Sequence, residues 1–262
     1  MTLLDTARAW LAEDPDPATS AQLSALISRA EAGDTDAAGE LADAFDGTLQ
    51  FGTAGLRGRL GPGSNRMNRI VVARVAAGLA AYLGAHGGKA VVIGYDARRN
   101  SDVFARDTAA IMSGAGITAM VLPSALPTPV LAFAIRQLGC DAGVMVTASH
   151  NPPDDNGYKV YLGDGSQIVP PADAAMAACI AAVGPLASIP QSDDFQTLDG
   201  VVLDSYMARA VSLLGDGPRD ASAVYTAMHG VGGEVFMRTV AAAGFPAPTK
   251  VAQQFTPDGR FP

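Results

Sequence analysis

Hydrophobic and polar positions alternate through the middle of the chain in the manner of an α/β fold. Short apolar runs at residues 90–94, 118–122 and 141–146 predict buried strands. Apolar residues at helical spacing predict helices over residues 101–113 and 128–138 between and after the first two runs. Strands that alternate with helices indicate a mixed, mainly parallel sheet with helices on both faces.

Polar residues and prolines mark the predicted helix starts. We expect Ser101 to cap one helix and Thr128 to cap the next, with Pro129 in its first turn. Asn65 or Asn68 is expected to cap an earlier apolar helix that runs to about residue 83. The helix dipole does not favour the arginines at positions 66 and 69 near that start, which leaves open a binding role or an ordinary surface role.

Both ends of the chain depart from this alternation. Residues 1–47 predict a helical extension that packs on a main domain at residues 48–190. Residues 184–200 lack apolar periodicity and predict a linker. Residues 191–262 hold one strand–helix–strand unit, with strands expected at 223–229 and 249–254, and one such unit cannot cover both faces of a sheet. We therefore expect an incomplete second domain and a chain that is the N-terminal part of a longer protein.

A stiff polar loop follows the predicted strand at residues 141–146. Pro152 and Pro153 fix φ and remove two backbone donors, and Asn156-Gly157 predicts a turn. A second strand is expected at residues 158–162. The loop therefore lies at the carboxyl end of a strand, where parallel sheets bind their ligands.

Three side chains of this region have the chemistry of phosphoryl transfer. The Ser149 hydroxyl could carry a phosphoryl group, and His150 and Lys159 offer donors and positive charge for phosphate oxygens. Serine is a weak nucleophile at neutral pH and needs a base, a metal or fixed positive charge beside it. Only three lysines and three histidines occur in the chain, so one of each in a single stretch is informative. Judged from residue types alone, the alternative is a rigid surface hairpin with solvated side chains.

A glycine-rich stretch at residues 49–59 offers further phosphate ligands. Its glycines let the backbone approach a ligand closely, and Arg57 and Arg59 can bind phosphate oxygens bidentately. A glycine-rich loop alone is a weak signal. The segment from Asp96 to Arg98 follows another predicted strand and so lies at the same edge of the sheet.

The sequences of these loops resemble the α-D-phosphohexomutases, the family of the phosphoglucomutases and phosphomannomutases. Ser-His-Asn-Pro-Pro-x-x-Asn-Gly-Tyr-Lys at residues 149–159 resembles the family's active-site loop, and Phe-Gly-Thr-Ala-Gly-Leu-Arg-Gly at 51–58 resembles its first loop. Thr-Ala-Met-His-Gly-Val-Gly-Gly at 226–233 resembles the start of its second domain. Asn-Arg-Met-Asn at 65–68 is similar to the phosphoglucomutase/phosphopentomutase-like branch.

The resemblance implies an intramolecular phosphotransferase that works through a phosphoserine and a bisphosphate intermediate. Sugar 1-phosphate and sugar 6-phosphate, or pentose 1- and 5-phosphates, would interconvert. Ser149, Lys159, His150 and Arg57 would be catalytic, and the last three would also bind substrate phosphate. For His150 a structural role as a brace of the loop is the alternative. Arg59 lies outside the family pattern, and a solvated surface role is expected for it.

The resemblance also implies cofactors and supporting residues. Mg²⁺ would bind through the phosphate on Ser149, with its other ligands in a loop absent from these residues, and a glucose 1,6-bisphosphate-type compound would be the activator. We expect the Asp96–Arg98 segment to brace the loop first and to contact substrate second. For His229 a structural role is favoured, although it could lie near the metal loop.

Composition and charge narrow the class of protein. Hydrophobic residues make up 48% and charged residues 17% of the chain, which indicates a soluble, core-forming protein. The net charge of −8 argues against a nucleic-acid partner, so a phosphosugar substrate would need a local basic cluster. Two cysteines without metal-like spacing and no signal peptide or membrane span predict a cytoplasmic protein.

The sequence leaves two points open. It does not determine the oligomeric state. It also allows a non-catalytic phosphosugar-binding protein derived from a mutase as the alternative to an active mutase, and the part of the enzyme seen here is expected to be inactive by itself.

Overall fold

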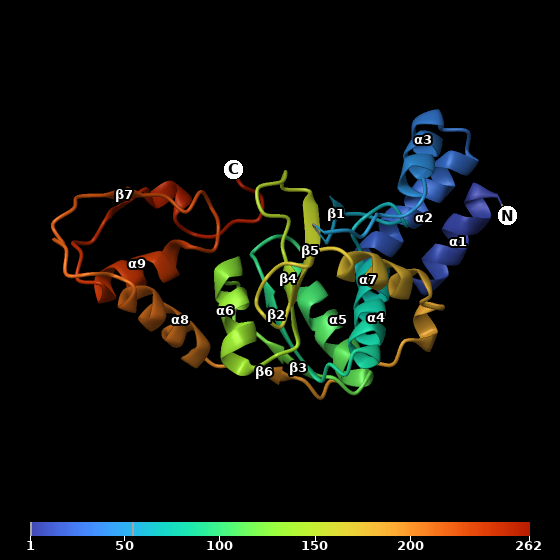
Figure 1. Cartoon of the computed structure of the whole chain (residues 1–262). Helices are drawn as coiled ribbons and strands as arrows, with labels where there is room; N and C mark the ends of the chain where they lie inside the picture. Colours follow the sequence, from blue (N-terminus) through green and yellow to red (C-terminus); the bar gives the residue numbers. More distant parts are fainter. Residues whose placement is uncertain (1, 54) are drawn as a thin grey trace.

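The computed structural model describes residues 2–53 and 55–262 and is built around a six-stranded sheet (Figure 1). In spatial order the strands are β1 (Leu56–Arg59), β5 (Asp155–Leu162), β4 (Ala142–Val146), β2 (Ala90–Tyr95), β3 (Thr118–Val121) and β6 (Gln196–Thr197). β2 runs parallel to β3 and β4, and β3 runs parallel to β6. β5 runs antiparallel to β1 and β4. The predicted mixed, mainly parallel sheet is confirmed.

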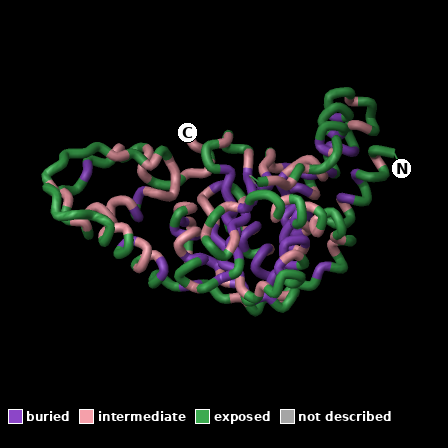
Figure 2. The backbone as a smooth tube through the Cα atoms, in the orientation of Figure 1, coloured by how far each residue is buried: buried purple, intermediate pink, exposed green. Residues whose placement is uncertain are grey.

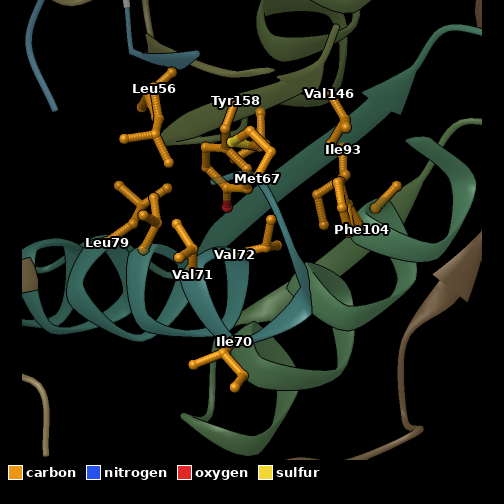
Figure 3. Packing of buried hydrophobic residues seen from close by; sticks show 14 of the residues in the cluster. Leu56, Met67, Ile70, Val71, Val72, Leu79, Ile93, Phe104, Val146 and Tyr158 are labelled. Carbon is orange, nitrogen blue, oxygen red and sulfur yellow. The ribbon is translucent and has the colours of Figure 1, made fainter. Parts of the chain in front are cut away.

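Helices cover both faces of this sheet, which is why its central strands are continuously apolar. On one face α4 (Arg69–Ala85) and α5 (Ser101–Gly114) pack against Ile93 and Tyr158, as Figure 3 shows, and α7 (Ala172–Ala181) packs on α4. On the other face α6 (Thr128–Leu138) packs against Met145, and α8 (Val201–Ser212) packs on α6. Figure 2 shows the buried backbone concentrated in these central layers.

The N-terminal helical extension is also present. It consists of α1 (Leu3–Glu13), α2 (Pro17–Glu31) and α3 (Thr35–Ala44). Thr2, Asp16 and Asp34 cap the three helices through side-chain bonds to backbone amides. Trp10 and Leu23 join the cluster that continues into α4, so the extension packs on the main domain. No helix of residues 2–53 and 55–262 is long and apolar enough to cross a membrane.

Asn68, one of the two expected residues, caps α4. Its side chain accepts a bond from the amide three residues on (3.0 Å) and donates to three carbonyls of the preceding loop. Arg66 pairs with Asp43 of α3, and Arg69 binds Asp107 of α5 at 2.7 and 2.8 Å. These pairs give both arginines a structural role between elements.

Two other capping predictions are wrong by one residue. Asn100, with φ of 66°, precedes α5, and the Ser101 hydroxyl donates instead to the Asp96 carboxylate at 2.7 Å. The hydroxyl donates to this carboxylate in a charge-assisted bond and accepts from the Asn156 side-chain amide at 3.0 Å, so it accepts no helix amide. α6 already includes Thr128, and Pro127 occupies the capping position.

The turn predicted at Asn156-Gly157 is wrong, because both residues lie inside β5. The Asn156 side chain is fully buried and donates to the Arg99 carbonyl (2.9 Å) and the Ser101 hydroxyl (3.0 Å), which holds this part of the chain extended. A Cβ at Gly157 would lie 2.6 Å from the Thr147 carbonyl oxygen. Glycine here allows close backbone packing and does not serve a turn. The end of the glycine-rich stretch likewise forms a strand, β1, rather than a loop.

The later part of the chain differs from the prediction in length and place of its strands. β6 lies within the predicted linker. β7 (Val224–Tyr225) and β8 (Thr249–Lys250) form a separate parallel pair, with α9 (Gly233–Ala242) between them. β7 is shorter than expected because the chain turns at Met228 and His229, whose φ values are 47° and 60°. β8 is shorter because residues Ala252–Gln254 form a 3-10 turn. The boundaries between domains stay a prediction.

Candidate active site

Arg98 holds the loop between β4 and β5 in place. Its guanidinium donates to four carbonyl oxygens of the loop region, those of Ser149 (2.9 Å), Asn151 (2.7 Å), Pro152 (2.8 Å) and Asp155 (3.1 Å). The side chain is only 1% exposed. A planar group with five donors suits this task as no other side chain does. The loop therefore has one backbone conformation fixed from its inner side.

Asp96 connects the end of β2 to the same loop. One carboxylate oxygen accepts from the Arg98 amide (3.0 Å) and from Ser101, and the other accepts from the Thr147 hydroxyl at 2.6 Å. The Thr147 oxygen in turn accepts from the Ser149 amide at 2.9 Å. Burial lowers the pKa of Arg98, and the neighbouring carboxylate of Asp96 acts in the opposite direction.

Ser149 stands exposed at the start of the braced loop. Its φ is 56°, in the left-handed region that costs a non-glycine residue about 1 kcal/mol. Its amide donates to the Thr147 hydroxyl oxygen and its carbonyl accepts from Arg98, and these two bonds hold it there. Its hydroxyl oxygen lies 3.4 Å from Nδ1 of His150, which is also exposed. Such maintained strain is common where a side chain must be presented for function.

Arg57 reaches this loop from β1. Its guanidinium donates to the Asn151 side-chain oxygen at 2.9 Å, and the Asn151 amide donates to the Asp155 carboxylate at 2.8 Å. Arg57 is half-buried, whereas Arg59 is exposed, in keeping with the surface role expected for it. Asn151 was not among the predicted site residues, because an Asn before two prolines looks like an ordinary turn residue.

Lys159 lies on the sheet face that carries this site. It pairs with Met145 in the antiparallel ladder, so both side chains lie on one face, and Arg57 pairs with Gly157, two residues before Lys159. The lysine is half-buried. Burial lowers its pKa first and Arg57 lowers it further, while Asp96 opposes the change. Lys159 and Arg57 thus form a local basic cluster on an acidic chain.

A cavity of about 130 Å³ adjoins Ser149. Its wall from the main domain includes Asp96, Thr147 and Met145, and residues far along the chain form the other wall: His229, Gly230, Val231 and Phe261. The backbone of His229 is held by Gln254 (2.8 Å) and Asp258 (3.0 Å). The structural role favoured for His229 did not anticipate its place beside Ser149. Neither that placement nor that of Phe261 has a signal in the local sequence, since both depend on how the later segment folds back.

Within the part of the chain that the structure describes, no three or more His, Cys, Asp or Glu side chains are grouped to hold a metal ion. The residues present therefore do not make up a complete Mg²⁺ site. Any such ion would need ligands beyond these groups.

A family model describes much of this architecture. The model "Phosphoglucomutase/phosphomannomutase, alpha/beta/alpha domain I" matches residues 48–185, which include the whole Ser149 loop and Arg57. The chain belongs to the phosphoglucomutase/phosphomannomutase family. The resemblance in the two loops is thus confirmed at the level of the family.

Relatives in this family are similar over most of the chain. A Haemophilus influenzae protein named "Probable phosphomannomutase" is 55% identical over 202 residues, covering 75% of this chain and 42% of the relative. A phosphoglucomutase of Staphylococcus epidermidis is 36% identical over 233 residues, covering 85% and 42%. A crystal structure of a phosphoglucomutase/phosphomannomutase family protein from Burkholderia thailandensis superimposes with a TM-score of 0.67 at 26% identity, covering 81% of this chain and 45% of that one. The chain thus spans less than half the length of each of these relatives.

Proposed function

We propose that this chain provides the phosphoserine part of a sugar-phosphate mutase, with Ser149 carrying the phosphoryl group. The observation that supports this best is the geometry of the loop. Arg98 binds it at four carbonyls, and Ser149 is presented at its exposed side in a strained conformation. The phosphoglucomutase and phosphomannomutase names of the relatives support the same class of reaction.

The proposed reaction moves one phosphoryl group in each direction. A hydroxyl oxygen of a sugar monophosphate attacks the phosphorus on Ser149. The bond from phosphorus to Oγ breaks as the new phosphorus–oxygen bond forms, and the hydroxyl proton is taken up while Oγ regains one. The sugar bisphosphate then reorients, and Oγ gives up its proton and attacks the phosphorus of the other phosphate. The bond from that phosphorus to the sugar oxygen breaks, and the released oxygen gains a proton. Sugar 1- and 6-phosphates, or pentose 1- and 5-phosphates, interconvert without net loss of phosphate.

Lys159 is the proposed acceptor of the hydroxyl proton. A lysine acts as a base only in its neutral form, and burial beside Arg57 favours that form by lowering its pKa. Arg57, fixed by Asn151, supplies permanent positive charge for the transferring phosphoryl oxygens. His150, 3.4 Å from Oγ, is placed to donate to a phosphate oxygen on Ser149.

The remaining parts of the proposal concern partners. Mg²⁺ would bind an oxygen of the Ser149 phosphate and neutralise charge there, and a glucose 1,6-bisphosphate-type activator would phosphorylate Ser149. The Asn-Arg-Met-Asn run favours glucose or pentose phosphates as substrates. Cys140 and Cys179 are both free, which supports a cytoplasmic location.

Phosphorus NMR tests the proposal and separates it from phosphosugar binding without turnover. The protein purified from its own cells is incubated with glucose 1-phosphate, mannose 1-phosphate or ribose 1-phosphate, a trace of the matching bisphosphate and Mg²⁺. We expect one substrate to convert to its 6- or 5-phosphate, and Ser149→Ala to abolish conversion. Ligand-induced line broadening without conversion would support the binding-only alternative, and equal conversion by Ser149→Ala would refute the proposal.

A further inference from the structure

The segment from Asp258 to Phe261 lies against the residues that brace the Ser149 loop. In Figure 1 the C-terminal end lies beside the loop before β5. The Phe261 ring lies over the Arg98 guanidinium, with Cζ 4.8 Å from the ring centroid. Phe261 also lines the cavity next to Ser149. The same ring thus contacts Arg98, which holds the loop, and borders the cavity next to Ser149, the proposed nucleophile.

An aromatic neighbour stabilises the Arg98 guanidinium in this position. The edge of its guanidinium is used by the four carbonyls. Among the residues that the structure describes, its Nε has no hydrogen-bond partner, the Asp96 carboxylate being 3.5 Å away. A buried cation without a full set of partners gains from an aromatic face, which attracts it electrostatically and keeps water off it. Because the Phe261 ring lies on the flat face of the guanidinium, the hydrogen bonds in the guanidinium plane to the four carbonyls are undisturbed.

The segment is built to hold this position. Asp258 donates its amide to the His229 carbonyl (3.0 Å), and Phe261 donates its amide to the Asp258 carbonyl (3.0 Å). The Asp258 carboxylate accepts from the Arg260 amide (2.9 Å) and binds the Arg260 guanidinium at 2.8 Å. A Cβ at Gly259 would lie 2.6 Å from the Ala97 carbonyl oxygen, so only glycine lets the turn sit this close to the Arg98 backbone.

We propose that Phe261 is a positioning residue for Ser149, which acts through Arg98 to keep the loop in its presenting conformation. This deepens the proposed function, because it assigns to the later segment a part in organising the phosphoserine site. Phe261 itself makes no bond to Ser149, and its effect passes through the guanidinium and the four loop carbonyls. Docking of the later segment therefore tightens the loop.

Hydrogen exchange of the loop amides in the full chain tests this directly. Ser149, Asn151 and Asp155 donate their amides within the loop region and report its opening. We expect Phe261→Ala to speed their exchange about threefold to tenfold, the effect of losing one cation–π contact. Phe261→Leu keeps apolar bulk but loses the ring face and should behave similarly, whereas Phe261→Tyr should stay within about twofold of the wild type.

Phe245 provides the matched control. It is similarly half-exposed and lies over the Arg219 guanidinium at 5.1 Å, so Phe245→Ala removes the same kind of contact away from the loop. It should leave loop exchange unchanged. Phe261→Ala added to Arg98→Lys should give no further acceleration, because the path through Arg98 is already broken.

Any one of three results would overturn the proposal. Loop exchange could be unchanged in Phe261→Ala and Phe261→Leu, or Phe261→Leu could keep loop exchange as slow as Phe261→Tyr does. The third is that Phe261→Ala and Arg98→Lys accelerate loop exchange additively. If Phe261→Ala does not fold, the leucine and tyrosine pair still decides. Phosphorylation of Ser149 by a sugar bisphosphate is measured in the same samples. Absence of phosphate in the wild type would count against the proposed function alone, since the exchange measurement does not depend on it.

Discussion

Replacing Arg98 with lysine keeps the positive charge but removes the fork that binds the Ser149 loop. A lysine has three donors on one nitrogen and cannot reach four carbonyls spread along residues 149–155. We expect it to keep one or two of the four bonds. The residues whose carbonyls lose their donor are themselves exposed or half-buried, so water can partly replace the lost bonds and the loss is smaller than their sum.

The size of the effect follows from these bonds. Hydrogen bonds to a charged group are each worth about 1.5–3 kcal/mol. Losing two or three of them, partly compensated by water, should lower the free energy of unfolding by about 2–4 kcal/mol. For a chain of this size the melting temperature should fall by about 5–12 °C. Hydrogen exchange of the loop amides should speed up more than the loss of global stability alone would cause, because the loop can open locally while the sheet stays folded.

Arg99 gives a matched control at the next position. Its side chain is 62% exposed, and its partner Asp154 lies 3.7 Å away. Arg99→Lys should change the free energy of unfolding by less than about 0.5 kcal/mol. Urea unfolding and hydrogen exchange of Arg98→Lys and Arg99→Lys, measured side by side, decide the matter. If the two variants are equally stable and have equal loop exchange, the bracing role of Arg98 is refuted.

Three further predictions concern the rest of the chain. Burial, with Asp141 beside it, raises the pKa of Cys140 to about 11. At pH 8 a thiol reagent should therefore modify Cys179 at least tenfold faster than the buried Cys140, as measured by peptide mapping. Equal rates would contradict this prediction. Hydrogen bonds from the backbone amides of Lys89 and, to a lesser extent, Ala90 lower the pKa of the Asp141 carboxyl. The stability that these bonds give the fold is therefore present above about pH 4 and is lost as the pH falls through the lowered pKa. Asp141→Asn should therefore cost about 0.5–1 kcal/mol at pH 7 and less at pH 3, and a cost that does not shrink would exclude this linkage. Gly157→Ala should destabilise the fold by about 1–3 kcal/mol, because the new Cβ would lie 2.6 Å from a carbonyl oxygen. Gly84→Ala, in open space on a helix, should be neutral or stabilising. Calorimetry of both variants tests this, and the opposite order of stability would contradict the packing described.

The sequence was sufficient for the parts of the fold that local pattern controls. The apolar runs of β2, β3 and β4 and the helices between them have their predicted places, because the strands are largely buried and each helix has an apolar stripe. The turn at Asn156-Gly157 could not be excluded locally. Asn156 is held extended by partners more than 50 residues away, and no local rule contains that information.

The site divides in the same way. Ser149, His150, Lys159 and Arg57 stand out by residue type and by family resemblance, and the structure gathers them at one edge of the sheet. Their catalytic roles remain proposals. What local pattern could not supply is the support around them, because the Arg98 bonds, the Arg57–Asn151 contact and the place of Phe261 are all contacts across long stretches of chain.

Peptide-mapped mass spectrometry of the protein from its own cells, before and after incubation with glucose 1,6-bisphosphate, tests the central claim most directly. The account predicts an increase of about 80 Da on the peptide that contains Ser149, and on no peptide of Ser149→Ala. The label should be lost on incubation with excess sugar monophosphate. A Ser149 peptide that stays unmodified under all these conditions, or phosphate found on another residue, would contradict the account.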